Sequence, residues 1–165
     1  MFLRIKHTKE ELKGVSDHLF YEFLMFINMA EEMQSGKYIQ GTTVMNALLE
    51  AFTIHARILL DFLYKTKDRV DDVVAGDFFA DEGIWLRIRP KMPPNLENLS
   101  KRVGKEIAHL TFSRLRVTPE NKPWTFVDIA RDMIGVFDKF LENVSKDNMH
   151  ISWNQYYSIR NRYFL

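Results

Sequence analysis

The residues of this chain best suited to chemistry are a guanidinium and an imidazole on one predicted helix, Arg102 and His109. The stretch 95–116 has apolar residues at helical spacing, which predicts an amphipathic helix with one face in the core. Seven residues make almost two helical turns. We therefore expect Arg102 and His109 on the same face, about 10.5 Å apart along the axis. The apolar positions are Leu96, Leu99, Val103, Ile107 and Leu110.

Further polar and basic residues follow the same flank of this predicted helix. Arginine binds phosphate oxygens with two parallel N–H groups, and histidine transfers protons near neutral pH. Five basic residues stand against one glutamate between positions 101 and 116, which gives a net charge of +4. Contact with phosphate groups or RNA is one interpretation, and ordinary solvated side chains are the other. The expected contact residues are Lys105, Ser113 and Arg116, with Arg57 from an earlier helix.

The segment RVGKEIAH, from Arg102 to His109, resembles the Arg-x(4–6)-His signature of the HEPN (higher eukaryotes and prokaryotes nucleotide-binding) domains. The resemblance covers roughly residues 42–144. In that family the signature lies on a late helix of an all-α bundle, and many members are metal-independent ribonucleases. Two copies usually dimerise so that their motifs meet. The resemblance implies that His109 transfers protons and that Arg102 stabilises the phosphorane.

One position departs from the pattern of active HEPN members. The residue after the arginine is often polar there, and this chain has Val103. Three functions are therefore open: a metal-independent endoribonuclease acting as a homodimer, an RNA- or nucleotide-binding protein that does not cleave, and a non-catalytic helical dimer with a structural or regulatory role. The sequence names neither an RNA target nor an antitoxin-like partner.

Other kinds of chemistry find little support. The chain has no cysteine, which excludes thiol catalysis and thiolate metal sites. Its five histidines are scattered, without the spacing of metal ligands, and it has no glycine-rich phosphate loop. We therefore expect neither a metal nor a cofactor.

Composition predicts one soluble domain, residues 1–165. The hydrophobic share is 46%, the charged share is 27% and the formal net charge is +1. Without an apolar run of about 18 residues or a signal-like start, the chain is predicted to be cytoplasmic, with no membrane partner.

Periodicity predicts an all-α antiparallel bundle of about four long helices. A capping box at Thr8 and Glu11 starts the first helix, and Gly36 ends it. A long irregular connection, residues 65–94, is expected to contain one or two short helices and a short extended segment, WLRIR. A short helix follows at the C-terminus. The long helices are expected at about 8–36, 42–64, 95–116 and 124–144.

Three further features have open interpretations. The helix 42–64 is apolar nearly all round, which is typical of a central helix or an oligomer interface. Within it His55 is predicted to be a core histidine with one hydrogen bond, and Arg57 to pair with Asp61. The acidic run 71–82 is predicted to be solvated, or to lie over the basic helix. The aromatic and basic tail 149–165 is predicted to dock on the core or a second subunit, or to stack on RNA bases.

Overall fold

The computed structural model of the chain describes residues 7–66, 69, 71–103, 112–116, 118 and 124–164. Within these residues every regular element is a helix, which confirms the predicted all-α class. The α-helices are α1 (Lys9–Gln34), α2 (Thr43–Tyr64), α3 (Glu82–Ile88), α4 (Pro94–Arg102), α5 (Phe126–Asn143) and α6 (Tyr156–Phe164). Short 3-10 helices are η1 (Ala75–Phe78), η3 (Phe112–Arg116), η4 (Lys146–Asn148) and η5 (Ile151–Gln155).

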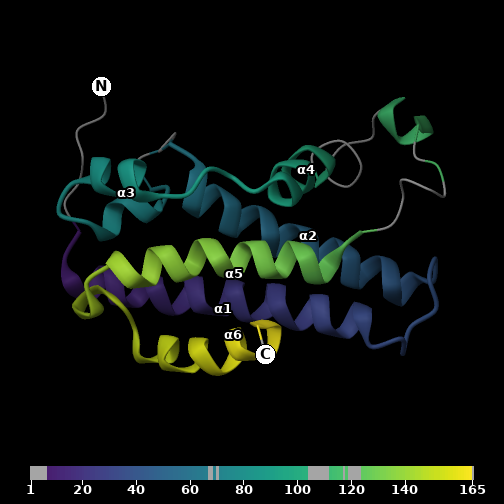
Figure 1. The fold of residues 1–165 in the computed structure, drawn as a ribbon, viewed down its shortest axis with the longest axis horizontal. Helices are drawn as coiled ribbons and strands as arrows, with labels where there is room; N and C mark the ends of the chain where they lie inside the picture. The colour runs from purple at the N-terminus through teal and green to yellow at the C-terminus, as the bar shows by residue number, and fades with distance from the viewer. Residues whose placement is uncertain are drawn as a thin grey trace.

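The three longest helices, α1, α2 and α5, lie side by side, with α3 and α4 along one edge and α6 along the other (Figure 1). α1 and α2 are antiparallel, and α5 runs back along α1 in the direction of α2. One hydrophobic core connects all six α-helices. The described residues form three long helices and not four. The described part of the predicted helix 95–116 contains only the short helix α4 and η3.

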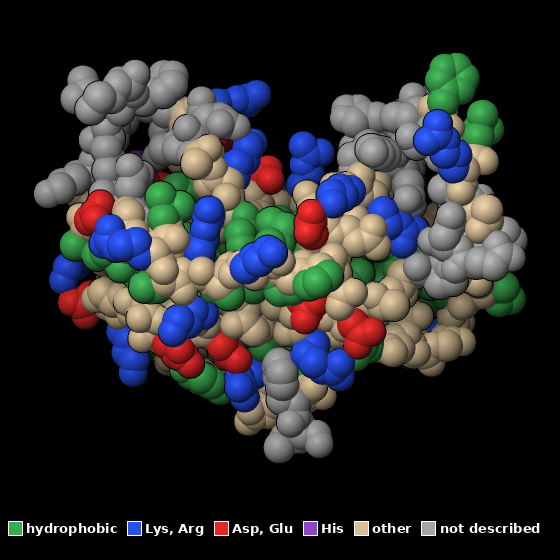
Figure 2. Space-filling model, turned by 45° about the horizontal axis from the view of Figure 1, so that its top comes forward, with side chains coloured by type: hydrophobic (Ala, Val, Ile, Leu, Met, Phe, Trp, Pro, Cys, Tyr) green, Lys and Arg blue, Asp and Glu red, His purple; other side chains and the backbone are tan. Residues whose placement is uncertain are grey.

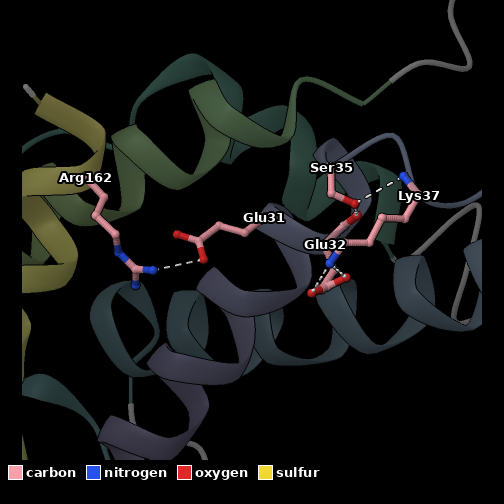
Figure 3. A network of polar contacts seen from close by, with 5 residues as sticks. All are labelled: Glu31, Glu32, Ser35, Lys37 and Arg162. Carbon is pink, nitrogen blue, oxygen red and sulfur yellow. Dashed lines mark hydrogen bonds and ion pairs between the residues drawn. The ribbon is translucent and has the colours of Figure 1, made fainter.

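α1 begins at a capping box and ends at a glycine. The Glu11 amide donates to Thr8 Oγ1 at 3.2 Å, and the Thr8 amide donates to the Glu11 carboxylate at 2.7 Å. At the other end Gly36 has a φ of 72°, a left-handed conformation that costs glycine little. Just beyond it, the Lys37 ammonium group lies 3.2 Å from the Glu32 carboxylate (Figure 3). Both ends of α1 lie where the sequence predicts them.

The centre of the core is aromatic. Phe137 of α5 lies with its ring centroid 5.2 Å from Phe23 of α1 and 5.6 Å from Trp153 of η5. One turn later, Phe140 lies 5.3 Å from Phe62 of α2 and 5.6 Å from Trp85 of α3. Ring pairs at these separations add stabilisation beyond the area they bury. α5 therefore joins elements from both ends of the chain.

In the connection between α2 and α4, the segment predicted to be extended is helical. Residues of WLRIR lie in α3, where the Asp81 side chain accepts from the Gly83 amide at 3.1 Å and caps the helix. The Trp85 indole is buried and donates to the Leu63 carbonyl at 2.8 Å. The extended prediction was wrong because alternation over five residues does not outweigh a cap and a buried indole.

The acidic run also departs from expectation at one residue. Asp77 is buried and accepts the Val74 amide at 3.0 Å, which closes the turn of η1. Asp71 and Asp81 are exposed. A solvated patch therefore describes these two residues but not Asp77.

The predicted helix 95–116 is not one α-helix through to Arg116. α4 covers Pro94–Arg102, begins after Pro93 and has a proline at its first position. Asn95 is therefore not the predicted cap; its side chain donates to Asp132 at 3.0 Å. The stretch 112–116 is a 3-10 helix, η3. Residues 104–111, including Ile107 and Leu110 of the predicted stripe, lie outside the described residues.

The C-terminal tail docks on the core, which is one of the alternatives predicted for it. Trp153 and Tyr156 are buried, and the Trp153 indole donates to the Ser16 carbonyl at 2.8 Å. The Arg160 guanidinium donates to Asp138 of α5 at 2.8 Å. Arg162 reaches Glu31 of α1 at 3.1 Å, which Figure 3 shows as a link between α6 and α1. Trp153 and Tyr156 are therefore structural and are not open to stack on RNA.

The phenol of Tyr156 provides a test of this docking. Its hydroxyl lies 3.0 Å from the Ile134 carbonyl and 2.9 Å from Asp138, and burial raises its pKa. Tyr156→Phe should lower the free energy of unfolding by about 1–2 kcal/mol, because it removes a buried hydrogen bond. Chemical denaturation measures the change. The exposed neighbour Tyr157 is the matched control, and Tyr157→Phe should have almost no effect; equal losses would contradict a specific role for Tyr156.

Candidate nucleic-acid-binding surface

Arg102 stands at the end of α4, where core packing fixes the helix. Leu96, Leu99 and Val103 are buried at helical spacing and hold α4 against the core. The Arg102 side chain is half-buried, and its guanidinium carbon lies 3.9 Å from the centroid of the Trp124 ring. This is a close cation–π contact, which orients the guanidinium plane. Arg102 is therefore a positioned cation.

The exposed face of α4 has charges of both signs. The Lys101 ammonium lies 2.8 Å from the Glu97 carboxylate, and this hydrogen bond lowers the pKa of Glu97. On the adjoining part of α5, Arg131 lies 3.0 Å from Asp128. Figure 2 shows the same mixture, with acidic side chains between the lysines and arginines. α4 alone is therefore not a strongly basic surface.

η3 presents apolar and basic side chains to solvent. Phe112 is 89% exposed and Leu115 is 83% exposed, and Arg116 is exposed beside them. In Figure 2 hydrophobic and basic side chains project at the upper right of the molecule. Exposed aromatic rings and arginines are the groups with which proteins hold single-stranded nucleic acid. η3 is therefore a candidate contact surface.

The structure describes some of the sequence-predicted site residues and not others. Arg102 and Arg116 are described, and Ser113 lies in η3. Lys105 and His109 lie outside the described residues, so the predicted shared face of Arg102 and His109 stays a prediction.

Arg57 is exposed on α2 and makes no ion pair with another described residue. Its expected partner Asp61 lies 3.8 Å from Lys65 instead, one turn further along the helix. The order of an acid before a base is the more favourable one on a helix, which explains the choice. The expected hydrogen bond of His55 is present, with Nδ1 2.6 Å from the Glu22 carboxylate, and the His55 side chain is 13% exposed.

Two arginines have aromatic partners that the sequence does not predict. Trp124 lies under Arg102, and Tyr64 lies 5.5 Å from the Arg89 guanidinium, which also donates to the Tyr64 carbonyl at 2.9 Å. Burial raises the pKa of Tyr64 to about 12. Both contacts join residues far apart in the chain, so helical spacing gave no signal for them.

Other candidate sites in the described residues are weaker. No group of three or more histidines and carboxylates suited to a metal ion occurs among them. A pocket of about 380 Å³ lies between α1, α2 and the following connection. Its lining combines apolar residues with titratable ones, namely His18, Glu22, Asp61, Lys65 and Asp72.

α2 is the one helix, among the described residues, with the length and apolar composition to span a membrane. The central helix of a soluble bundle has the same length and composition. Phe52, Ala56 and Leu59 of α2 are fully buried against the rest of the core. The membrane signal in the structure is therefore weak.

No protein-family model, no curated protein and no solved structure matches the chain. The resemblance to HEPN domains thus depends on the segment from Arg102 to His109, and it stays a hypothesis. The all-α bundle is the class that the structure defines.

The contact between Arg102 and Trp124 can be tested by stability. Arg102→Gln should lower the free energy of unfolding by about 1 kcal/mol, because the glutamine side chain has no charge to hold over the indole. Thermal or chemical denaturation measures this loss. Lys101→Gln, which removes the neighbouring exposed cation of α4, should leave stability nearly unchanged, and an equal loss there would show that general charge is responsible.

Proposed function

We propose that this protein binds single-stranded RNA, in the cytoplasm, through the surface that starts at Arg102 and includes η3. The observation that carries the proposal is the exposure of Phe112 beside Arg116. Phe112 is 89% exposed and buries little of its surface in the folded chain, so its apolar area is available to a base. The net charge of +4 over residues 101–116 supports a polyanionic ligand.

The types of these residues indicate which part of the RNA each one contacts. Aromatic rings stack on bases of any sequence, and arginines hold the backbone phosphates. Arg102 is held over Trp124, so that its orientation is set before a ligand arrives. A pre-oriented cation loses less conformational entropy on binding. Phosphate contact at Arg102 and base stacking at Phe112 therefore support the same ligand class.

Binding of a fluorescent single-stranded RNA of mixed sequence tests this proposal. Affinity should fall as salt rises. Phe112→Ala should weaken binding about tenfold, because one base loses its stacking partner. Arg116→Ala should lower the slope of log K against log salt by about 0.7, the loss of one phosphate contact.

Tyr157→Ala is the matched control, since Tyr157 is an exposed aromatic residue on α6, on the other side of the bundle (Figure 1). It should leave RNA affinity unchanged. If Phe112→Ala and Tyr157→Ala behave alike, binding does not use η3.

We further propose that Arg102 and His109 cleave the bound RNA without a metal ion. In this reaction the ribose 2′ oxygen attacks phosphorus and loses its proton, and the 5′ oxygen leaves and takes one up. The products are a cyclic 2′,3′-phosphate and a 5′ hydroxyl. His109 would move protons and Arg102 would stabilise the charge on the phosphorane. Each chain has one such histidine, and a second copy would supply another set.

His109→Ala should abolish cleavage of a mixed RNA in EDTA while the circular dichroism of the helices stays the same. Gel analysis of end-labelled RNA measures the products. His18→Ala replaces an exposed histidine of α1 and should cleave like the unmodified protein. Retained cleavage in His109→Ala would reject the assignment. If the unmodified protein binds RNA but does not cleave it, the protein is an RNA-binding protein without nuclease activity.

One observation favours a second candidate function, a non-catalytic helical dimer with a structural or regulatory role. The outer face of α2 presents apolar residues to solvent, among them Ile54, which is 57% exposed. Absence of RNA binding, together with a stable dimer, would support this alternative.

A further inference from the structure

The outer face of α2 has a regular apolar stripe. Its positions follow one another at intervals of three, four, three and four residues, and they lie opposite the fully buried face of Phe52 and Ala56. Three of its members have large exposed fractions: 53% for Val44, 57% for Ile54 and 41% for Ile58. We call these residues the α2 stripe: Val44, Ala47, Ala51, Ile54 and Ile58.

This spacing is the pattern of a two-helix seam. Apolar residues that alternate at three and four positions keep one edge of a helix facing a partner helix. From Val44 to Ile58 the stripe is about 21 Å long. Val44, Ala47, Ile54 and Ile58 are exposed and Ala51 between them is partly exposed, so the stripe is more than a single exposed side chain.

Charged residues flank the stripe on one side. Glu50 and Arg57 are both exposed, seven residues apart, and therefore lie in one row along α2. Neither forms an ion pair with another described residue. On the other side the row is less charged: it contains Leu48 and His55, whose ring is held by Glu22 of α1 at 2.6 Å. The two flanks thus differ in chemistry.

We propose that a second copy of this chain covers the α2 stripe, with the two α2 helices antiparallel. In this arrangement Ala51 faces Ile54 of the second copy, and Ala47 faces Ile58. Small residues opposite large ones let the two helices approach closely and interdigitate. The twofold axis then places Glu50 of each copy beside Arg57 of the other, which makes two equivalent ion pairs.

The charges select this direction over a parallel one. In a parallel pair, Glu50 of one copy would face the less charged row of the other copy, beside His55. In the antiparallel pair both Glu50 and Arg57 find an opposite charge. A contact between two identical chains is expected to be self-complementary in this way. The paired charges therefore favour a second copy over a different helix or a lipid surface.

This contact is independent of the proposed RNA binding. α4 packs on α2 and α5, whereas the stripe lies on the exposed side of α2. A dimer through the stripe uses none of the residues to which the proposed RNA contact is assigned, Arg102, Phe112 and Arg116. Loss of the dimer and loss of RNA binding are therefore separate results.

Sedimentation equilibrium over a range of concentrations tests the proposal. The unmodified protein should dimerise, and Ile54→Glu should weaken the dimer about a hundredfold or more, because it places two carboxylates in the seam. Glu50→Arg and Arg57→Glu should each weaken it about tenfold, since each variant replaces attraction by repulsion in two pairs. The double variant Glu50→Arg/Arg57→Glu should restore it.

Leu86→Glu is the matched control, because Leu86 is half-exposed on α3, away from the stripe. It should leave the dimer intact. Circular dichroism checks that each variant keeps its helices, which is expected because the altered side chains are exposed. If the unmodified protein is a monomer, the proposal is wrong. Binding of that monomer to phosphatidylcholine vesicles would then indicate that the stripe contacts lipid. A dimer that survives Ile54→Glu would also overturn the proposal.

Cross-linking tests the direction, since the chain has no cysteine of its own. Mixed chains of Ala51→Cys and Ile54→Cys should form a disulfide with each other faster than either forms one with itself, because the antiparallel seam places these two positions opposite. Faster cross-linking of Ala51→Cys with itself would indicate a parallel pair and overturn the arrangement.

Discussion

The packing of two phenylalanines, Phe137 and Phe140, holds the rest of this structure together. They lie almost one turn apart on α5 and reach different partners. Phe137 contacts Phe23 of α1 and Trp153 of the tail, whereas Phe140 contacts Phe62 of α2 and Trp85 of the connection. Side chains three residues apart lie on the same face of a helix, one above the other, so this short segment of α5 packs against four other elements at once.

This arrangement explains what the sequence predicts well. α1, α2 and α5 have long, regular apolar periods, and their ends have chemical signals such as the capping box at Thr8 and the positive φ of Gly36. Local pattern and tertiary packing agree there. The docking of the aromatic tail was one of two open interpretations, because composition shows that rings must be buried and does not show against what.

Prediction failed where a tertiary contact decides the local conformation. α3 forms where Trp85 reaches the Leu63 carbonyl on a different helix. Asp77 is a local exception, because it is buried where its carboxylate closes the turn of η1. For the candidate site the sequence identified Arg102 and Arg116 but not Trp124, whose role depends on a contact between residues distant in the chain. The pairing of Arg102 with His109 stays a sequence prediction.

The contact of Arg102 with Trp124 also gives the protein an internal optical probe. The chain has three tryptophans; Trp85 and Trp153 are buried in the core, while Trp124 is half-buried under a guanidinium. Indole emission is sensitive to a charge above the ring, so any ligand that draws Arg102 away changes the emission of Trp124 alone. A chain with phenylalanine at the two core positions would then signal occupancy of this surface without an attached dye.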